Sequence, residues 1–281
     1  MNILIANYRT IRSAEVTLLA AALAKKHKVT IACMATESSY RGLAFQHTND
    51  PTRVSQVYGD KIAVFDDSDV SKLKCPGYEF YSNPADMISI MLGEIMRHAT
   101  KPQAHRPDLV ICGIGNGVNL GPDIYSSSMI GMAFESTFFG VPAIVVSTEH
   151  NAGGNSPRHI KPVVQFIEKQ LEKLAAIKLP PQTFLNINLP RVESYKEFKG
   201  IKTTRMGKMD MKLEYTEKTD PKGHKYFWAK RATRDNDAEC GNDDRTWHDK
   251  GYVTVTPINY DATDRDAIKQ FGCIDTKLKR K

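Results

Sequence analysis

Glycine, asparagine and serine are concentrated in residues 113–128 of the 281-residue sequence. This stretch follows the apolar residues 109–111 and contains Asn116, Asn119 and three consecutive serines at 126–128. Glycine lets the backbone approach a ligand closely, while asparagine and serine offer short polar groups that donate or accept hydrogen bonds. The composition therefore predicts a ligand-binding loop. The competing interpretation is an ordinary turn, because glycine and asparagine also favour turns.

Three apolar segments are expected to form the strands that deliver this loop and two others to one edge of a sheet. Residues 2–6 and 29–33 are rich in apolar and β-branched side chains, and between them the apolar positions after Ser13 recur at helical spacing. A strand, a helix and a second strand in succession indicate a parallel sheet, in which ligands bind beyond the carboxyl ends of the strands. The loops expected to meet at that edge are 7–10, 35–42 and 112–128.

The remaining segments predict an α/β fold with an extension. The expected helices are 84–98, 129–139 and 159–176, and the expected strands are 142–147, 184–190 and 251–257. Two β-rich segments, 211–217 and 225–230, flank Asp220-Pro221-Lys222-Gly223, in which proline presets φ and glycine accepts a positive φ. This pattern predicts a projecting β-hairpin. We therefore expect one domain with a core at 1–198, a hairpin arm at 199–240, and a final strand and tail at 241–281.

Composition excludes several classes of protein. The chain is 41% hydrophobic and 25% charged, as is typical of soluble globular proteins. No apolar run approaches the roughly 20 residues that span a bilayer. Much of the net charge of +7 comes from residues 25–28 and 277–281, without a basic face carrying interleaved aromatic residues. Neither a membrane nor a nucleic acid is therefore expected as a partner.

The five cysteines, at positions 33, 75, 112, 240 and 273, are widely spaced and form no CxxC pair. This pattern favours neither a zinc site nor a disulfide framework, and it is typical of a cytoplasmic protein. The amino terminus has no basic segment before its short apolar run, so we interpret it as a first strand and not as a signal peptide.

Five blocks, in order along the chain, resemble the SurE family of survival-protein phosphatases, which act as 5′(3′)-nucleotidases. The first block runs from Pro107-Asp108 through Ile114 to Asn119 and Tyr125-Ser126. The other four are residues 142–147, 185–190, 220–223 and 251–257. The resemblance covers nearly the whole chain. It implies a Rossmann-like three-layer sandwich with a mostly parallel sheet, a homodimer or homotetramer formed through the hairpin arm, and hydrolysis of nucleoside monophosphates with a divalent metal, Mg²⁺ or Mn²⁺.

The sequence departs from the family at the positions that hold this metal. The family has Asn-Asp-Asp-Gly after the first strand, and its two aspartates bind the metal. The corresponding segment here is Asn7-Tyr8-Arg9-Thr10. Hard divalent cations need oxygen ligands, usually carboxylates. A guanidinium about 4 Å from a dication, at an effective dielectric constant of about 20, repels it by roughly 8 kcal/mol.

Two further family metal positions lie in the other loops. The asparagine ligand of the family falls on Gly115, next to Asn116. The serine ligand is matched by Ser39, but Tyr40 follows it in place of glycine. With Tyr8 and Arg9 these complete the four family metal positions, and we expect the usual metal-dependent mechanism to be lost.

Arg9 is expected to take the place of the cation. A guanidinium binds phosphate through two parallel hydrogen bonds, so an anion site survives the loss of the metal. The residues expected to bind a nucleotide or another phosphorylated small molecule are Asn7, Arg9, Ser39, Asn116, Asn119, Ser126, Ser127 and Ser128.

Three functions are compatible with this pattern. A metal-dependent nucleotidase would recruit Asn116, Ser39 and the nearby Glu37 as substitute ligands. A non-catalytic pseudoenzyme would bind a nucleotide or phosphoester, or act as an oligomeric interaction module. A metal-free hydrolase would use one of the serines at 126–128 as nucleophile and His150 as base, which requires the two side chains to lie within hydrogen-bond reach.

Overall fold

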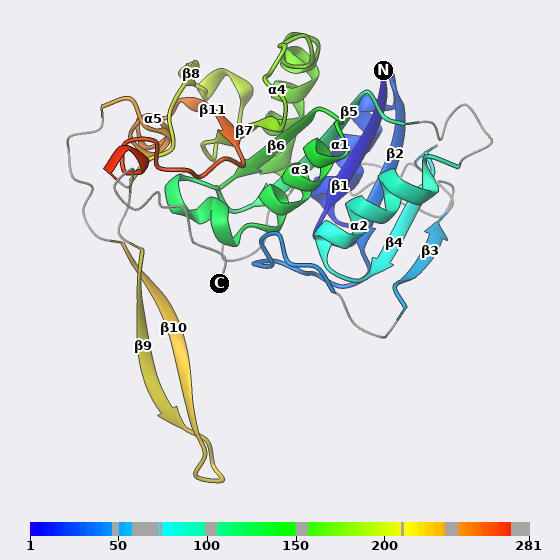
Figure 1. Ribbon diagram of the computed structural model, residues 1–281. Helices are drawn as coiled ribbons and strands as arrows, with labels where there is room; N and C mark the ends of the chain where they lie inside the picture. The colour runs from blue at the N-terminus through cyan, green and yellow to red at the C-terminus, as the bar shows by residue number, and fades with distance from the viewer. Residues whose placement is uncertain are drawn as a thin grey trace, which may run out of the picture.

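The computed structural model describes residues 1–46, 51–57, 73, 75–98, 106–149, 157–208, 211–233 and 241–270. Its centre is a nine-stranded sheet with the order β3-β4-β2-β1-β5-β6-β7-β11-β8 (Figure 1). The strands are β1 (Asn2–Asn7), β2 (Lys28–Met34), β3 (Arg53–Val57), β4 (Gly77–Tyr81), β5 (Leu109–Asn116), β6 (Ala143–Thr148), β7 (Thr183–Leu189), β8 (Ile201–Thr203) and β11 (Val253–Asn259). The strands from β4 to β7 in this order run parallel, while β3 and β11 are antiparallel to their neighbours β4 and β7.

Helices cover both faces of the sheet. Helices α1 (Ala14–Leu23) and α4 (Pro157–Ala175) pack on one face, and α2 (Pro84–Ile90) and α3 (Ser128–Phe138) on the other. The central strand β1 serves both layers because successive side chains point to opposite faces. Ile3 and Ile5 lie in the core under α1 and α4, whereas Leu4 and Ala6 lie in the core under α2 and α3. The predicted three-layer α/β sandwich with a mostly parallel sheet is therefore confirmed.

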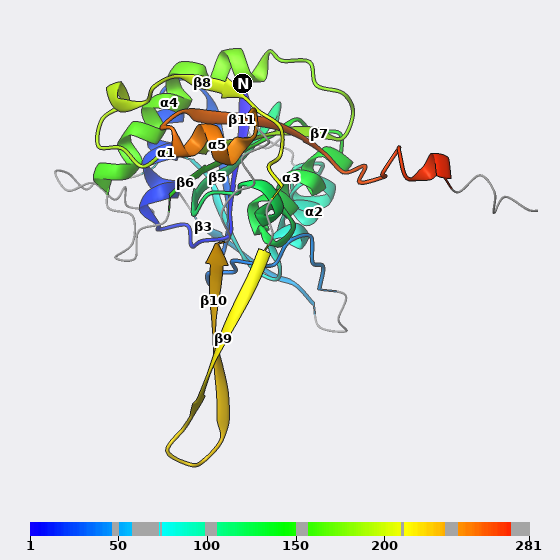
Figure 2. The ribbon, with the colours of Figure 1, turned by 90° about the vertical axis from the view of Figure 1, so that its left-hand side faces the viewer.

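The predicted hairpin is also present. Strands β9 (Met211–Thr219) and β10 (Lys225–Thr233) pair antiparallel around a turn in which Gly223 has a φ of +86°. Both ribbon views show this pair as an arm that projects away from the body (Figures 1 and 2).

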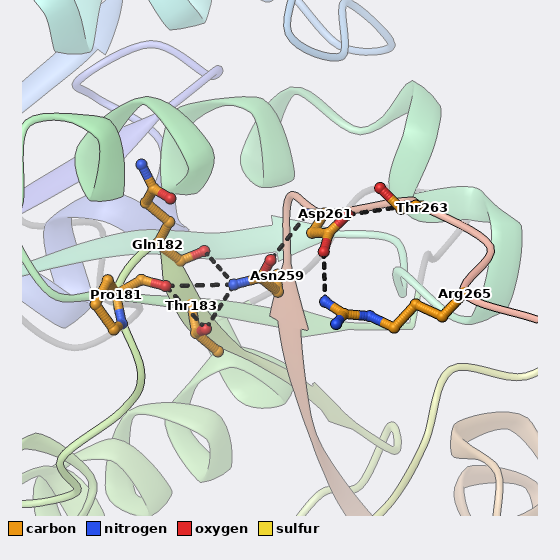
Figure 3. A network of polar contacts seen from close by, with 7 residues as sticks. All are labelled: Pro181, Gln182, Thr183, Asn259, Asp261, Thr263 and Arg265. Carbon is orange, nitrogen blue, oxygen red and sulfur yellow. Dashed lines mark hydrogen bonds and ion pairs between the residues drawn. The ribbon is translucent and has the colours of Figure 1, made fainter. Parts of the chain in front are cut away.

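The chain after β11 is tied back to the loop that precedes β7 (Figure 3). The Asn259 side-chain amide donates to the carbonyls of Pro181 and Gln182, both at 3.3 Å, and to the Thr183 hydroxyl at 2.9 Å. Asp261 continues the network through its ion pair with Arg265. These contacts fix the end of the final strand. Within the described residues, no helix is long and apolar enough to cross a membrane.

Several details differ from the sequence-based expectations. The helix expected at 84–98 is α-helical only to Ile90 and continues as a π turn, Met91–Ile95. The structure also contains β3, β4, β8 and a short helix, α5 (Asp244–Asp249), none of which was expected from the sequence. Ser13 stands at the N-cap of α1, but its hydroxyl makes no capping hydrogen bond. His150 lies outside the described residues.

Candidate functional site

The loops that follow β1, β2 and β5 meet at the carboxyl edge of the sheet, where they enclose a pocket of about 240 Å³. The first loop contributes Tyr8, and the second contributes Glu37, Ser39 and Tyr40. The rest of the described lining is Asn116, Gly117, Val118, Asn119, Asp123, Ser126, Ser127, Ser128 and Met129, from the third loop and the start of α3. Six of the eight residues predicted to bind a phosphorylated ligand thus share one pocket, whereas Asn7 and Arg9 are not among its described lining.

The loop after β2 is fastened against the start of α3. The Arg41 amide donates to the Ser128 hydroxyl at 3.0 Å, and that hydroxyl donates to the Ser38 carbonyl at 2.7 Å. The Gly42 amide donates to the Ser126 carbonyl at 3.1 Å. A β-carbon on Gly131 in α3 would lie only 1.9 Å from the Gly42 carbonyl oxygen. The wall of the pocket therefore depends on a backbone approach that glycine alone permits.

The three serines at 126–128 hold this wall together. The Ser127 hydroxyl caps α3 by accepting from the Ile130 amide at 3.4 Å, and the Ser126 hydroxyl donates to the Asp123 carbonyl at 3.2 Å. Ser128 binds the facing loop, as described above. The hydroxyl protons of Ser126 and Ser128 thus have acceptors within the chain, and these two serines fasten the wall of the pocket.

Tyr8 lies at the base of the pocket and is almost fully buried. Its hydroxyl accepts a hydrogen bond from the Asn116 amide at 3.3 Å. Burial raises the pKa of the phenol, and the Asn116 amide and the charge of Arg9 only partly oppose that effect. The tyrosine is therefore a neutral group at neutral pH.

Arg9 is held between two carboxylates. Its Nη1 lies 3.5 Å from Oε1 of Glu15, and its Nη2 lies 3.9 Å from Oε2 of Glu37. The Glu15 side chain is only 3% exposed, whereas that of Glu37 is 53% exposed and lines the pocket. Burial raises the pKa of Glu15, although the guanidinium beside it favours the ionised form. Arg9 thus has one fixed, buried partner and one partner that water can replace.

Asn7 and Asn119 are buried and stabilise the loops around the pocket through hydrogen bonds. The Asn7 side-chain amide donates to the Ile114 carbonyl at 3.2 Å, and its oxygen accepts from the Arg9 amide at 3.0 Å. Asn119 donates from its backbone to the Asn188 side chain and from its side chain to the Ser147 hydroxyl, both at 2.7 Å. Both asparagines position the pocket, and Asn119 also contributes to its lining.

Asp244, at the start of α5, is a further site residue that the sequence analysis missed. Its buried carboxylate accepts from the Gly121 amide at 3.0 Å and from the Gly207 amide at 2.9 Å. Gly121 begins the turn that leads to the pocket serines, and Gly207 precedes the arm. Burial raises the pKa of Asp244, while the backbone amides oppose this shift. One side chain therefore joins the pocket loop to the root of the arm.

Comparisons with known proteins agree with this arrangement. The sequence model of the family described as survival protein SurE matches residues 3–213. The chain is 29% identical over 272 residues to the 5′-nucleotidase SurE of Syntrophobacter fumaroxidans, covering 97% of this chain and 98% of that protein. It is 30% identical over 284 residues to the 5′-nucleotidase SurE of Thermoanaerobacter sp. strain X514, covering 99% and 100%. The crystal structure of the SurE protein from Aquifex aeolicus superposes with a TM-score of 0.74 at 25% identity, covering 98% of this chain and 99% of that one.

Proposed function

The chain belongs to the SurE family, and we propose that its pocket binds a nucleotide or another phosphorylated small molecule without using a divalent metal. The relatives that match the chain over nearly its whole length are named 5′-nucleotidases. The pocket would thus bind the class of ligand on which the names of these relatives suggest that they act. Metal-dependent hydrolysis would belong to the ancestry of this chain and not to its present activity.

The side chains at the family metal positions do not suit Mg²⁺ or Mn²⁺. Tyr8 offers a neutral phenol and Arg9 a cation, whereas a hard dication prefers anionic oxygen ligands. Gly115 offers no side chain, and a β-carbon there would lie 3.1 Å from the Ser147 hydroxyl oxygen. The two carboxylates beside this end of β1, Glu15 and Glu37, are already paired with Arg9. Arg9 thus pairs with the two carboxylates that a metal would otherwise bind.

The contact between Arg9 and Glu37 carries the proposal, because Glu37 lines the pocket whereas Arg9 is not among its described lining. The long, half-exposed pair between Arg9 and Glu37 is worth at most about 1 kcal/mol, so a phosphate can displace the Glu37 carboxylate from Nη2. The buried contact with Glu15 would keep the guanidinium in place during that exchange. The amino-terminal end of α3 adds backbone amides and a favourable dipole at the opposite wall.

Two alternative functions would require other arrangements of the side chains in the same pocket. A metal-dependent nucleotidase would need Glu37, Ser39 and Asn116 to converge on one cation, and Glu37 would have to leave Arg9. A metal-free hydrolase would need a free hydroxyl at 126–128, but the hydroxyl protons of Ser126 and Ser128 already have acceptors, and the Ser127 hydroxyl would have to give up its cap on α3. The metal-free binding site also requires Glu37 to leave Arg9, but it requires neither a dication beside the Arg9 guanidinium nor a free serine hydroxyl, and it is favoured for that reason.

Calorimetric titration and an activity assay on the same protein would test the proposal. We expect adenosine 5′-monophosphate to bind equally well with Mn²⁺, with Mg²⁺ and with EDTA, and no metal to raise hydrolysis of nucleoside monophosphates or of an aryl phosphate above the EDTA control. Arg9→Lys keeps the charge beside Glu15 but loses the planar fork, so the nucleotide should bind about tenfold more weakly. The exposed Arg12→Lys serves as the matched control.

Metal-dependent turnover by the unmodified protein would overturn this proposal and direct attention to Glu37 and Asn116 as ligands. The Tyr8→Asp, Arg9→Asp double variant extends the test. Gain of metal-dependent hydrolysis in that variant would show that these two substitutions alone inactivated the pocket.

We further propose that the arm joins two copies of the chain. A two-stranded ribbon is marginally stable by itself, and this one exposes Tyr215, Tyr226, Phe227 and Trp228. Light scattering should give twice the chain mass of 31.5 kDa for the wild-type protein, and the single-chain mass for the Phe227→Ser, Trp228→Ser variant. Tyr260→Ser, which removes an exposed aromatic residue from the body, should leave the dimer intact. A monomeric wild-type protein would contradict the proposal.

A further inference from the structure

Tyr40 has an unusual backbone conformation at the mouth of the pocket. Its φ is +58°, and Gln182 is the only other non-glycine residue in the described chain with a positive φ. A side chain other than that of glycine is strained in this left-handed region. The Tyr40 side chain is nevertheless large, 73% exposed, and part of the pocket lining. Packing in the core therefore does not explain why a tyrosine occupies this position.

Hydrogen bonds on both sides of Tyr40 fasten its loop to the rest of the protein. On one side, the Ser38 amide donates to the Tyr8 carbonyl at 3.0 Å. On the other side, the Arg41 amide donates to the Ser128 hydroxyl at 3.0 Å. These bonds fasten the loop to the residue that follows β1 and to α3, and Tyr40 turns in the left-handed sense between the two attachments. The ring is thereby carried on a backbone that is already ordered before a ligand arrives.

The volume of the pocket indicates which part of a bound nucleotide would lie beside the Tyr40 ring. About 240 Å³ is below the roughly 300–1,000 Å³ of pockets that enclose a drug-sized ligand. A phosphate and its sugar would fill the interior, and a base attached to the sugar would extend to the mouth, where Tyr40 lies. An exposed aromatic ring on a fastened backbone offers a flat, apolar surface for stacking, and a tyrosine side chain has few rotatable bonds to order.

We propose that Tyr40 is the platform on which the planar aromatic group of the ligand stacks. The pocket would then select phosphomonoesters that carry a nucleobase or an aryl ring over sugar phosphates and inorganic phosphate. This inference rests on the proposed function, since it assumes that the anionic group of the same ligand lies inside the pocket.

Titration calorimetry with adenosine 5′-monophosphate and ribose 5-phosphate separates the contribution of the base to the affinity from that of the sugar phosphate. For the wild-type protein we expect the nucleotide to bind at least tenfold more tightly than the sugar phosphate, since stacking of one base on one aromatic side chain is worth about that factor or more. Tyr40→Phe should keep this ratio. Tyr40→Asn should bring it close to one without changing the affinity for ribose 5-phosphate, because asparagine tolerates a positive φ but has no ring.

Two controls make the test specific. Tyr125→Asn removes a tyrosine that is 67% exposed but is not among the described lining, and it should leave the ratio unchanged. Tyr40→Gly should raise the denaturation midpoint by relieving the backbone while it abolishes the preference for the nucleotide. An unchanged ratio in Tyr40→Asn, or a wild-type protein that binds both probes equally, would overturn the stacking role alone. Failure of both probes to bind the wild-type protein would overturn the proposed function and this inference together.

Discussion

Replacing Gly131 by alanine should destabilise the protein by about 3 kcal/mol, even though alanine in a helix interior is ordinarily about 1 kcal/mol better than glycine. The reversal comes from one contact. The new methyl group would lie 1.9 Å from the Gly42 carbonyl oxygen, which belongs to backbone and not to a flexible side chain. The loop after β2 would have to move away from α3 and lose the hydrogen bonds that Ser126 and Ser128 make with it.

Urea denaturation of Gly131→Ala beside Gly241→Ala would measure this effect. At Gly241 a β-carbon would meet no atom within 4 Å, and the midpoint should move by less than the equivalent of about 0.5 kcal/mol. Because the displaced loop carries Glu37, Ser39 and Tyr40, Gly131→Ala should also bind adenosine 5′-monophosphate more weakly. A Gly131→Ala protein with wild-type stability and wild-type affinity would show that the loop does not press on α3 in solution.

Removing the Asp244 carboxylate should cost about 3 kcal/mol, because Asp244→Ala leaves the amides of Gly121 and Gly207 without their acceptor in a buried place. A β-carbon at Gly207 would lie 2.9 Å from an Asp244 carboxylate oxygen, so the three backbones around this side chain are closely packed. Water therefore has little room to replace the carboxylate. Asp244→Asn keeps one acceptor oxygen but turns its NH2 group toward a backbone amide on the other side, so it should lose a large part of the same stability.

The matched control is Asp266→Ala, since the Asp266 side chain is exposed and pairs with Lys269 at the surface. Its midpoint should stay within the equivalent of about 0.5 kcal/mol of the wild type. Equal midpoints for Asp244→Ala and Asp266→Ala would mean that the amides of Gly121 and Gly207 find other acceptors, and that Asp244 does not hold the pocket loop.

Much of the fold could be predicted from the order of apolar and polar residues within each segment. In β1, Ile3 and Ile5 face one helical layer, and Leu4 faces the other, so a continuously apolar segment correctly indicates a strand buried on both sides. The loops after β1, β2 and β5 could be placed together because carboxyl ends of parallel strands share one edge. Strand β8 is only three residues long and is exposed or half-buried, so it carries no comparable signal.

The interior of the site could not be predicted in the same way. The sequence places Arg9 beside the pocket but does not reveal that Glu15, six positions later, reaches it from the first turn of α1. Asp244 is 123 residues from Gly121, and the packing of α5 against β11 and the hydrogen bond between Asp244 and Arg205 help to bring them together. The serines at 126–128 were predicted as ligand donors, although two of their hydroxyl protons are used within the chain. Such partnerships depend on tertiary geometry, which residue types and spacings do not encode locally.

The position of Asp244 has a consequence for how ligand and subunit binding affect each other. The segment entering the arm is also joined to the segment leaving it, since the Arg205 amide donates to the Asn242 carbonyl at 3.2 Å and the Asp244 amide to the Arg205 carbonyl at 3.0 Å. If a ligand displaced Gly121, the Asp244 carboxylate would pass that displacement to both ends of the arm. Coupling between two binding equilibria is reciprocal by thermodynamic necessity. A nucleotide that strengthens the association of the arm with a second subunit by some factor is itself bound more tightly, by the same factor, once that subunit is in place.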